Sequence, residues 1–199
     1  MYLTYKGPFQ YARVRYFRKI FSTYASQPGA KVLDFGCGPG DTLLVCKELG
    51  VDAVGVDAFD YSIKIAAERG LSVIKADHTN LPFEKNSFDV IFLQSVLEHL
   101  RDPVETIEAL KAYLKPTGAL ILSSPTPGPH FWDDPTHVRP FTIQSFRTLA
   151  QWAGLKLELN TYVLSYLLGL NIQTSLVYKL LNILPFSLGS NIIGVFRKA

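Results

Sequence analysis

A strand, a glycine-rich loop and a helix follow one another at residues 32–49, and this unit constrains the fold more than any other. Val32 to Phe35 have the apolar character of a buried parallel strand. Three glycines then permit a tight turn in which the backbone can approach a ligand closely: Gly36, Gly38 and Gly40. From Asp41 the apolar residues recur at helical spacing. The unit therefore predicts a nucleotide-type cradle at a helix N-terminus.

The charges around the loop indicate which kind of ligand it binds. A dinucleotide fingerprint, Gly-x-Gly-x-x-Gly, would need its third glycine at position 41, which is Asp. The observed spacing is Asp-x-Gly-x-Gly-x-Gly, beginning at Asp34. Two acids suit a ligand that presents a positive charge, and they would repel a pyrophosphate. An NAD-dependent oxidoreductase is therefore disfavoured.

The stretch from Asp34 to Gly40 resembles the first motif of the class I S-adenosylmethionine (SAM) methyltransferases. The resemblance covers roughly residues 30–160 and the final strand, and it is densest between residues 81 and 100. It implies SAM as the cofactor and S-adenosylhomocysteine as the product. In that family the acid and the glycines lie under the amino-acid end of SAM, which implies contacts with Asp34, Gly36, Cys37, Gly38 and Gly40.

The remaining cofactor residues are expected where successive strands end. Asp57 ends the second predicted strand, where a carboxylate can accept both ribose hydroxyls, and Ala58 follows it. The resemblance implies that Asp77 hydrogen-bonds the adenine amino group and that the backbone amide of His78 meets the ring. Gln94 lies at the C-terminal end of the fourth strand, the edge at which ligands bind in open α/β sheets.

A proline-stiffened loop at residues 125–141 leaves the fifth predicted strand at the edge where the methyl group of SAM should point. Its Thr-His-x-Arg-Pro-Phe-Thr run resembles a motif in a subset of small SAM methyltransferases, in which the histidine lies close to the acceptor site. The residues expected to contact the acceptor are His99, His130, Trp132, His137 and Arg139. For His99, capping and packing is the alternative role.

Methyl transfer from a sulfonium is an in-line displacement, so positioning can supply most of the rate. An oxygen or protonated nitrogen acceptor must also lose a proton. His137 is the candidate base, because an unperturbed imidazole titrates near neutrality; the alternative is that it only ties down its loop. Asp133, Asp134 and His137 fit no standard metal-ligand spacing, so we expect no metal.

Strands and helices alternate strictly up to residue 123, which predicts a doubly wound, Rossmann-like α/β fold with helices on both faces. The resemblance implies seven strands in the order 3-2-1-4-5-7-6, with the last strand antiparallel. Asp102, Pro103 and Glu105 form a helix start, and Thr142 can cap the next helix. We expect a single domain over residues 1–199.

Two segments lie outside the resemblance and are expected to set specificity. Residues 9–24 predict an amphipathic helix. In the family such a helix often covers the SAM pocket, with Tyr5 or Arg13 near the carboxylate; the alternative is a solvated basic face. The apolar excursion at residues 163–189 is expected to form two short helices. We leave open whether it is a lid, a homodimer surface or a patch for peripheral membrane contact.

The bulk composition narrows the function further. A net charge of +3 is too small to indicate a nucleic-acid partner, and no Asn-Pro-Pro-Tyr-like element follows the fourth strand. Two cysteines and no apolar leader indicate a cytoplasmic protein, with membrane association through the excursion left open. The sequence predicts a SAM-dependent methyltransferase with a small-molecule or lipid-linked acceptor. The alternative is a non-catalytic SAM-binding module that binds a protein partner.

Overall fold

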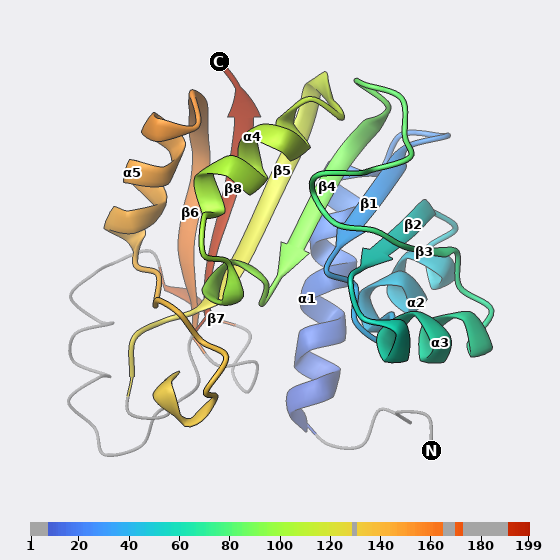
Figure 1. The fold of residues 1–199 in the computed structure, drawn as a ribbon, viewed down its shortest axis with the longest axis horizontal. Coiled ribbons are helices and arrows are strands. Elements are labelled where there is room, and N and C mark those ends of the chain that lie inside the picture. Colours follow the sequence, from blue (N-terminus) through green and yellow to red (C-terminus); the bar gives the residue numbers. More distant parts are fainter. Residues whose placement is uncertain (1–7, 129–130, 165–169, 173–190) are drawn as a thin grey trace.

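The protein folds as one twisted sheet with helices packed on both faces (Figure 1). This computed structural model describes residues 8–128, 131–164, 170–172 and 191–199. The helices are α1 (Pro8–Tyr24), α2 (Asp41–Glu48), α3 (Asp60–Glu68), α4 (Pro103–Lys111) and α5 (Ile143–Trp152), with short 3-10 turns η1 (Leu97–His99) and η2 (Phe131–Asp133). The strands are β1 (Lys31–Phe35), β2 (Asp52–Asp57), β3 (Val73–Lys75), β4 (Phe88–Gln94), β5 (Leu114–Pro125), β6 (Leu155–Leu164), β7 (Leu170–Ile172) and β8 (Asn191–Lys198).

The sheet runs in the order β3-β2-β1-β4-β5-β8-β6-β7. Strands β1 to β5 are parallel, and β8 inserts antiparallel between β5 and β6. The order predicted for seven strands is therefore confirmed, because β6 and β8 are its sixth and seventh strands. The structure adds an eighth strand, β7, at the edge.

The apolar excursion at residues 163–189 was expected to form two short helices, and this is wrong for its described residues, which are strands. Val163 and Leu164 continue β6, and β7 pairs antiparallel with them through Asn171 and Leu170. The reason is that β6 is already held on its other side by β8, so the backbone is extended and β7 completes its second ladder. Residues 165–169 and 173–189 lie outside the described residues. The lid, dimer and membrane interpretations depend on them and stay predictions. In the described part of the chain, no helix has both the length and the apolar character to cross a membrane.

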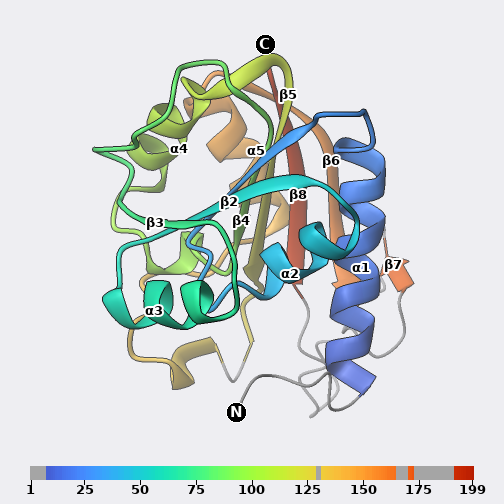
Figure 2. The ribbon, with the colours of Figure 1, turned by 90° about the vertical axis from the view of Figure 1, so that its right-hand side faces the viewer.

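Two apolar layers hold the helices to the sheet, and Figure 2 shows α1 and α4 on opposite sides of it. Phe17 and Phe21 of α1 each meet Phe92 of β4 edge to face, at 5.5 Å between ring centroids. On the other face, α4 and α5 pack through Ile107 and Phe146. Strand β4 is buried at every position except its last, which explains its continuous apolar run.

Local signals for the helix starts are confirmed. Asp102 caps α4 by accepting from the Glu105 amide at 2.9 Å, and Pro103 is the first helical residue. Thr142 caps α5 in a reciprocal capping box with Ser145. The predicted helix at residues 9–24 is α1. Tyr5 and the side chain of Arg13 lie outside the described part, so their contact with the cofactor stays a prediction.

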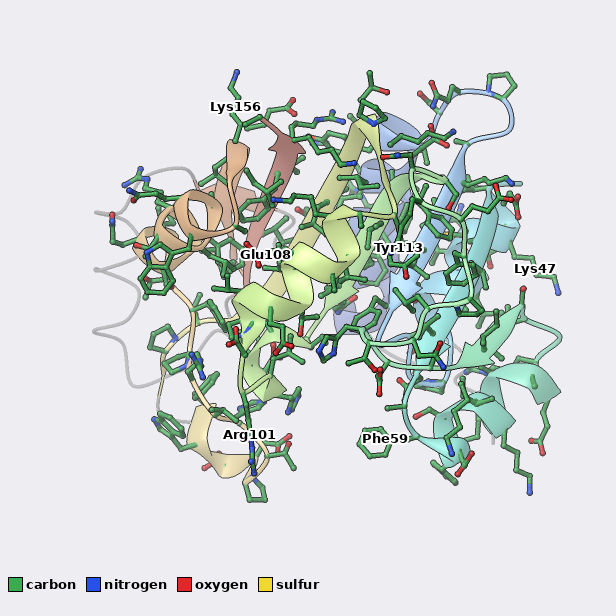
Figure 3. The ribbon with its side chains drawn as sticks, turned by 45° about the horizontal axis from the view of Figure 1, so that its top comes forward. Lys47, Phe59, Arg101, Glu108, Tyr113 and Lys156 are labelled. Atoms are coloured by element: carbon green, nitrogen blue, oxygen red, sulfur yellow. The ribbon has the colours of Figure 1, made fainter. Side chains whose placement is uncertain are left out.

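The topology fixes where a ligand can bind. From β1 the chain proceeds to β2 and β3 on one side, and it then returns to place β4 and β5 on the other. The C-terminal ends of β1 and β4 therefore flank the point where strand order reverses, and open α/β sheets bind ligands there. Phe59 and Arg101 both lie at this edge of the molecule (Figure 3).

Candidate active site

The glycine loop after β1 is a tight turn fastened to β2. Gly36, Gly38 and Gly40 all have positive φ, of 75°, 53° and 86°, which side chains other than glycine rarely adopt. A Cβ on Gly36 or Gly40 would meet neighbouring side chains at 2.4 Å or 2.3 Å, whereas a Cβ on Gly38 would meet nothing within 4 Å. The loop is therefore packed at both ends and open in the middle, where a ligand can approach the backbone.

Asp34 supplies a buried acid beneath this loop. Its side chain is 1% exposed, and its Oδ2 atom has no hydrogen-bond partner in the described structure. Burial, together with the carboxylates of Asp57 and Asp41, raises the pKa of Asp34 to about 8. A cationic group that entered the loop would favour the ionised form of Asp34, which fits the ammonium or sulfonium of SAM.

Asp57 fastens the loop from the tip of β2. Its two carboxylate oxygens accept from the backbone amides of Gly38 and Phe59, each at 2.9 Å. Ala58 is exposed beside it. The predicted contact with the ribose hydroxyls stays a prediction, and it would use the remaining lone pairs of the same oxygens. Burial also raises the pKa of the neighbouring Cys37 thiol, so Cys37 is a neutral part of the loop.

The segment after β3 holds the two residues assigned to adenine. Asp77 is exposed and accepts from the amide and hydroxyl of Thr79, at 2.8 Å and 2.6 Å. These two hydrogen bonds lower the pKa of Asp77. His78 is half-buried beside it. Asp77 is thus a turn-forming carboxylate at the edge where β3 ends, and its contact with adenine stays a prediction.

The end of β4 connects the glycine loop to the predicted acceptor residues. Gln94 is the last residue of β4 and is half-buried. Ser95 then adopts a left-handed conformation with φ of 51°, and its amide donates to the Ser123 carbonyl at 2.8 Å. This turn places Val96 against Gly36 and starts the short η1 turn that carries Glu98 and His99.

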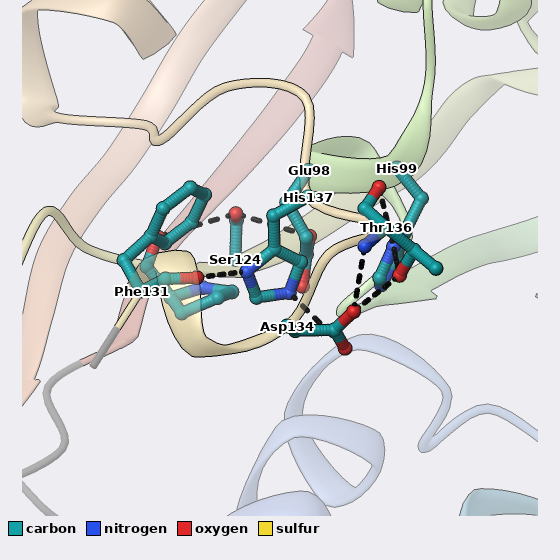
Figure 4. A network of polar contacts seen from close by, with 8 residues as sticks. Glu98, His99, Ser124, Phe131, Asp134, Thr136 and His137 are labelled. Atoms are coloured by element: carbon teal, nitrogen blue, oxygen red, sulfur yellow. Dashed lines mark hydrogen bonds and ion pairs between the residues drawn. The ribbon is translucent and has the colours of Figure 1, made fainter.

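The rings of His137, from the 125–141 loop, and His99, from η1, lie next to each other in the network shown in Figure 4. Their ring centroids lie 4.9 Å apart, and the His137 ring also stacks on Phe131 at 4.4 Å. The Nδ1 atom of His137 is hydrogen-bonded to the Phe131 carbonyl. Because a carbonyl only accepts, this nitrogen carries a proton, and in the neutral imidazole Nε2 then holds the lone pair. The structure thus brings together two of the predicted acceptor residues.

Glu98 is the buried member of this network, and it was not predicted. Its side chain is 0% exposed, Oε2 accepts from the Ser124 hydroxyl at 3.1 Å, and Oε1 has no partner in the described structure. Its carbonyl accepts from the Val138 amide, which holds the 125–141 loop over η1. Burial raises the pKa of Glu98. A sequence signal did exist, because Glu98 interrupts the apolar run from Val96 to Leu100.

Other predicted acceptor residues do not join the network. Arg139 is exposed, and its guanidinium donates to the Arg101 carbonyl. Both arginines line a separate groove of about 610 Å³ beside α5. Trp132 is 61% exposed and contacts Phe131 edge to face at 4.9 Å. His130 lies outside the described residues.

Comparison with known proteins places these features in a family. Residues 9–160 match the family described as a methyltransferase domain. A ubiquinone biosynthesis O-methyltransferase from Bordetella avium is 33% identical over 106 residues, covering 50% of this chain and 44% of that protein. One from Haemophilus ducreyi is 36% identical over 109 residues, covering 48% and 45%. The chain thus spans less than half the length of these curated relatives.

The fold is also shared. A SAM-dependent methyltransferase from Archaeoglobus fulgidus superimposes with a TM-score of 0.65 at 22% identity, over 93% of this chain and 94% of that one. This likeness in fold covers nearly the whole chain. The family match alone covers well over half of the chain, and its loop has the spacing of the first motif. The chain belongs to the class I SAM-dependent methyltransferase family.

Proposed function

We propose that this protein transfers the methyl group of SAM to a hydroxyl group of a small-molecule or lipid-linked acceptor. The observation that carries the proposal is Asp34, a buried carboxylate with an unpartnered oxygen beneath a backbone that is open at Gly38. An unpaired buried acid costs free energy, and a cationic ligand offsets that cost. The site therefore fits a cofactor with a positive charge.

The residues at the end of β1 and β2 fit SAM. Asp34 and the loop would hold the amino-acid end, Asp57 the ribose and Asp77 the adenine. Bound SAM supplies an electrophilic methyl group on a positively charged sulfur. The protein has to orient the acceptor in line with that methyl group, exclude water and receive a proton.

His137 would receive the proton. The Phe131 carbonyl holds the Nδ1 proton, so Nε2 is the basic nitrogen. Asp134 Oδ2 lies 3.8 Å from Nε2 and would stabilise the imidazolium once it forms. In the transfer, the acceptor oxygen bonds to the methyl carbon, the carbon–sulfur bond breaks with its electron pair on sulfur, and the hydroxyl proton passes to Nε2.

The names of the relatives support a hydroxylated quinone precursor as the acceptor class. Both are called ubiquinone biosynthesis O-methyltransferases. Because this chain spans less than half the length of each relative, a quinone precursor as acceptor is proposed here and does not follow from the family assignment. The apolar composition of residues 163–189 agrees with an acceptor that carries a lipid tail.

The first test is SAM binding by calorimetry. Wild-type protein is expected to bind SAM, and Asp34→Asn is expected to bind it at least tenfold more weakly. Asp52→Asn is the matched control, because Asp52 is an exposed acid at the start of β2, at the end of the strand away from Asp57 and the glycine loop. Equal SAM affinity in all three proteins would contradict the role of Asp34.

The second test is transfer of labelled methyl groups to prenylated and unprenylated hydroxybenzenes. Label in the acceptor hydroxyl, dependent on Asp34, is the expected result. SAM binding with no transfer to any hydroxyl, amine or carbon acceptor would replace the proposal with a non-catalytic SAM-binding module.

A further inference from the structure

Three side chains around η1 present ligand atoms to one another, and the proposed methyl transfer uses only one of them, His137. They are Glu98, His99 and His137. One ligand atom of each lies within 4.8 Å of a ligand atom of each of the others. In Figure 4, Glu98 lies next to the His137 ring, and His99 lies beside Thr136. The three residues come from two segments that the Val138–Glu98 hydrogen bond holds together.

The positions of the protons show what this cluster lacks. The Thr136 hydroxyl donates its single proton to Asp134 at 2.6 Å, so its oxygen can only accept from His99. His99 Nδ1 lies 3.0 Å from that oxygen and must therefore carry the proton. His137 donates its Nδ1 proton to the Phe131 carbonyl. In the neutral form of both rings, Nε2 is therefore the nitrogen with a lone pair.

Glu98 adds an anionic oxygen to these two nitrogens. Oε2 is satisfied by Ser124, but Oε1 is buried and has no partner in the described structure. The side chain is 0% exposed, so water does not compensate the missing hydrogen bond from the surface. In the neutral form of both rings, two imidazole lone pairs and one unpaired carboxylate oxygen face one another. A cation bound among them would pair with all three groups.

We propose that Glu98, His99 and His137 bind a divalent transition-metal ion. Two imidazoles and one carboxylate are the ligands of zinc and of the neighbouring first-row ions, whereas magnesium and calcium prefer oxygen alone. The hydrogen bonds to Thr136 and Phe131 are the outer contacts that metal-ligating histidines use to fix their tautomer. Ligand atoms about 2.0–2.2 Å from an ion lie closer together than 4.8 Å, so the exposed His99 ring would close onto the ion.

This site differs from the cation site considered from the sequence. Asp133 and Asp134 neighbour His137 in the chain, but the clustered acid is Glu98, which lies 39 positions before His137. Asp134 Oδ1 instead accepts from both the amide and the hydroxyl of Thr136, at 2.9 Å and 2.6 Å. Asp134 thus supports the His99 partner rather than serving as a ligand.

Binding of the ion stands independently of the proposed function, whereas its role in catalysis rests on that function. Three protein ligands leave a coordination position open, which an acceptor oxygen can take. An ion there would lower the pKa of an acceptor hydroxyl that occupied this position. With Nε2 of His137 engaged as a ligand, the hydroxyl proton would pass to water, and the ion would replace His137 in activating the acceptor.

The experiment measures metal binding by the SAM-free protein, after chelator treatment and dialysis. Zinc competition against a chromophoric chelator is expected to give one tight site in wild-type protein, and magnesium alone is expected to compete poorly. Glu98→Gln and His99→Gln are each expected to weaken zinc binding roughly tenfold or more. His78→Gln is the matched histidine control and should retain wild-type zinc affinity. Cobalt should give visible absorption bands in wild-type protein that both cluster variants lose.

The outcomes separate the metal site from methyl transfer. Far-UV circular dichroism and SAM calorimetry with chelator present check that the variants fold and bind cofactor. Absence of zinc binding in wild-type protein would overturn the inference, and so would wild-type zinc affinity in both Glu98→Gln and His99→Gln. If zinc binds as expected but no acceptor is methylated, the metal site stands and the proposed function fails.

Discussion

Val96 lies directly over Gly36, at a distance that leaves no room for a side chain on the glycine: a Cβ there would meet Val96 Cγ2 at 2.4 Å. Val96 also precedes the η1 turn that carries Glu98 and His99. The contact therefore joins the cofactor loop to the histidine network. We therefore expect a substitution at Gly36 or at Val96 to disturb both the cofactor loop and the histidine network.

The first prediction compares two alanine substitutions in the same loop. Gly36→Ala combines a positive φ with the clash at Val96, and we expect it to lower the free energy of unfolding by about 2–4 kcal/mol. Gly38→Ala has the backbone strain without the clash, and we expect it to lower the free energy of unfolding by about 1 kcal/mol. The Cβ of an alanine at position 38 should instead occupy space that SAM needs and abolish SAM binding. Urea unfolding and SAM calorimetry test the pair; equal destabilisation would contradict the packing argument.

The second prediction concerns pH. The pKa of Asp34 is raised from 3.8 to about 8, so between these values the native state holds a proton that the unfolded state has lost. Stability must therefore fall as pH rises through that window, by up to about 1.4 kcal/mol per pH unit. Asp34→Asn removes this dependence. Urea unfolding at pH 5, 6.5 and 8 should show the variant gaining on wild-type protein as pH rises; a constant difference would rule out the raised pKa.

The third prediction concerns proton transfer at His137. We expect His137→Gln to lower kcat about 100-fold, because glutamine cannot accept the acceptor proton or ligate an ion in the same way. SAM affinity should stay within about twofold, since the substitution is outside the glycine loop. Val138→Ala is the control: its side chain is exposed and its amide still donates to Glu98. Initial rates with a hydroxylated acceptor provide the measurement, and a wild-type rate in His137→Gln would show that the residue is structural.

The fourth prediction concerns how α1 is attached. Phe92 is buried in β4 and contacts both Phe17 and Phe21. We expect Phe92→Ala to cost about 3–5 kcal/mol and to loosen α1 from the sheet. Phe59→Ala removes the same side chain from an exposed position and should change stability by less than about 0.5 kcal/mol. Chemical denaturation compares the two, and hydrogen exchange in α1 reports its release.

Much of the fold could be predicted because its signals are local. The strand–loop–helix unit, the cap at Asp102 and the cap at Thr142 each depend on residues within a few positions. The sheet order followed from the family resemblance. The strand β7 was missed because an apolar segment with no charge pattern is compatible with a helix or a strand, and β6 decides between them through pairing.

The site was predicted unevenly for a related reason. The loop acid and glycines are contiguous, so their spacing alone identifies them. Glu98 and His137 are 39 positions apart, and only the return of the 125–141 loop over η1 brings them together. Arg139 was expected at the acceptor site with His137, but its guanidinium donates to the Arg101 carbonyl and lies outside the network.

The position of β8 has a consequence for how the chain is made. Strand β6 leaves the ribosome before β8, yet in the described sheet the backbone ladder reaches β6 from the parallel strands through β8. Until Asn191–Lys198 has been synthesised, β5 and β6 each present an open edge that another nascent chain can pair with. The eight-residue strand β8 thus closes two sheet edges at once, and both edges stay open to other chains until it pairs.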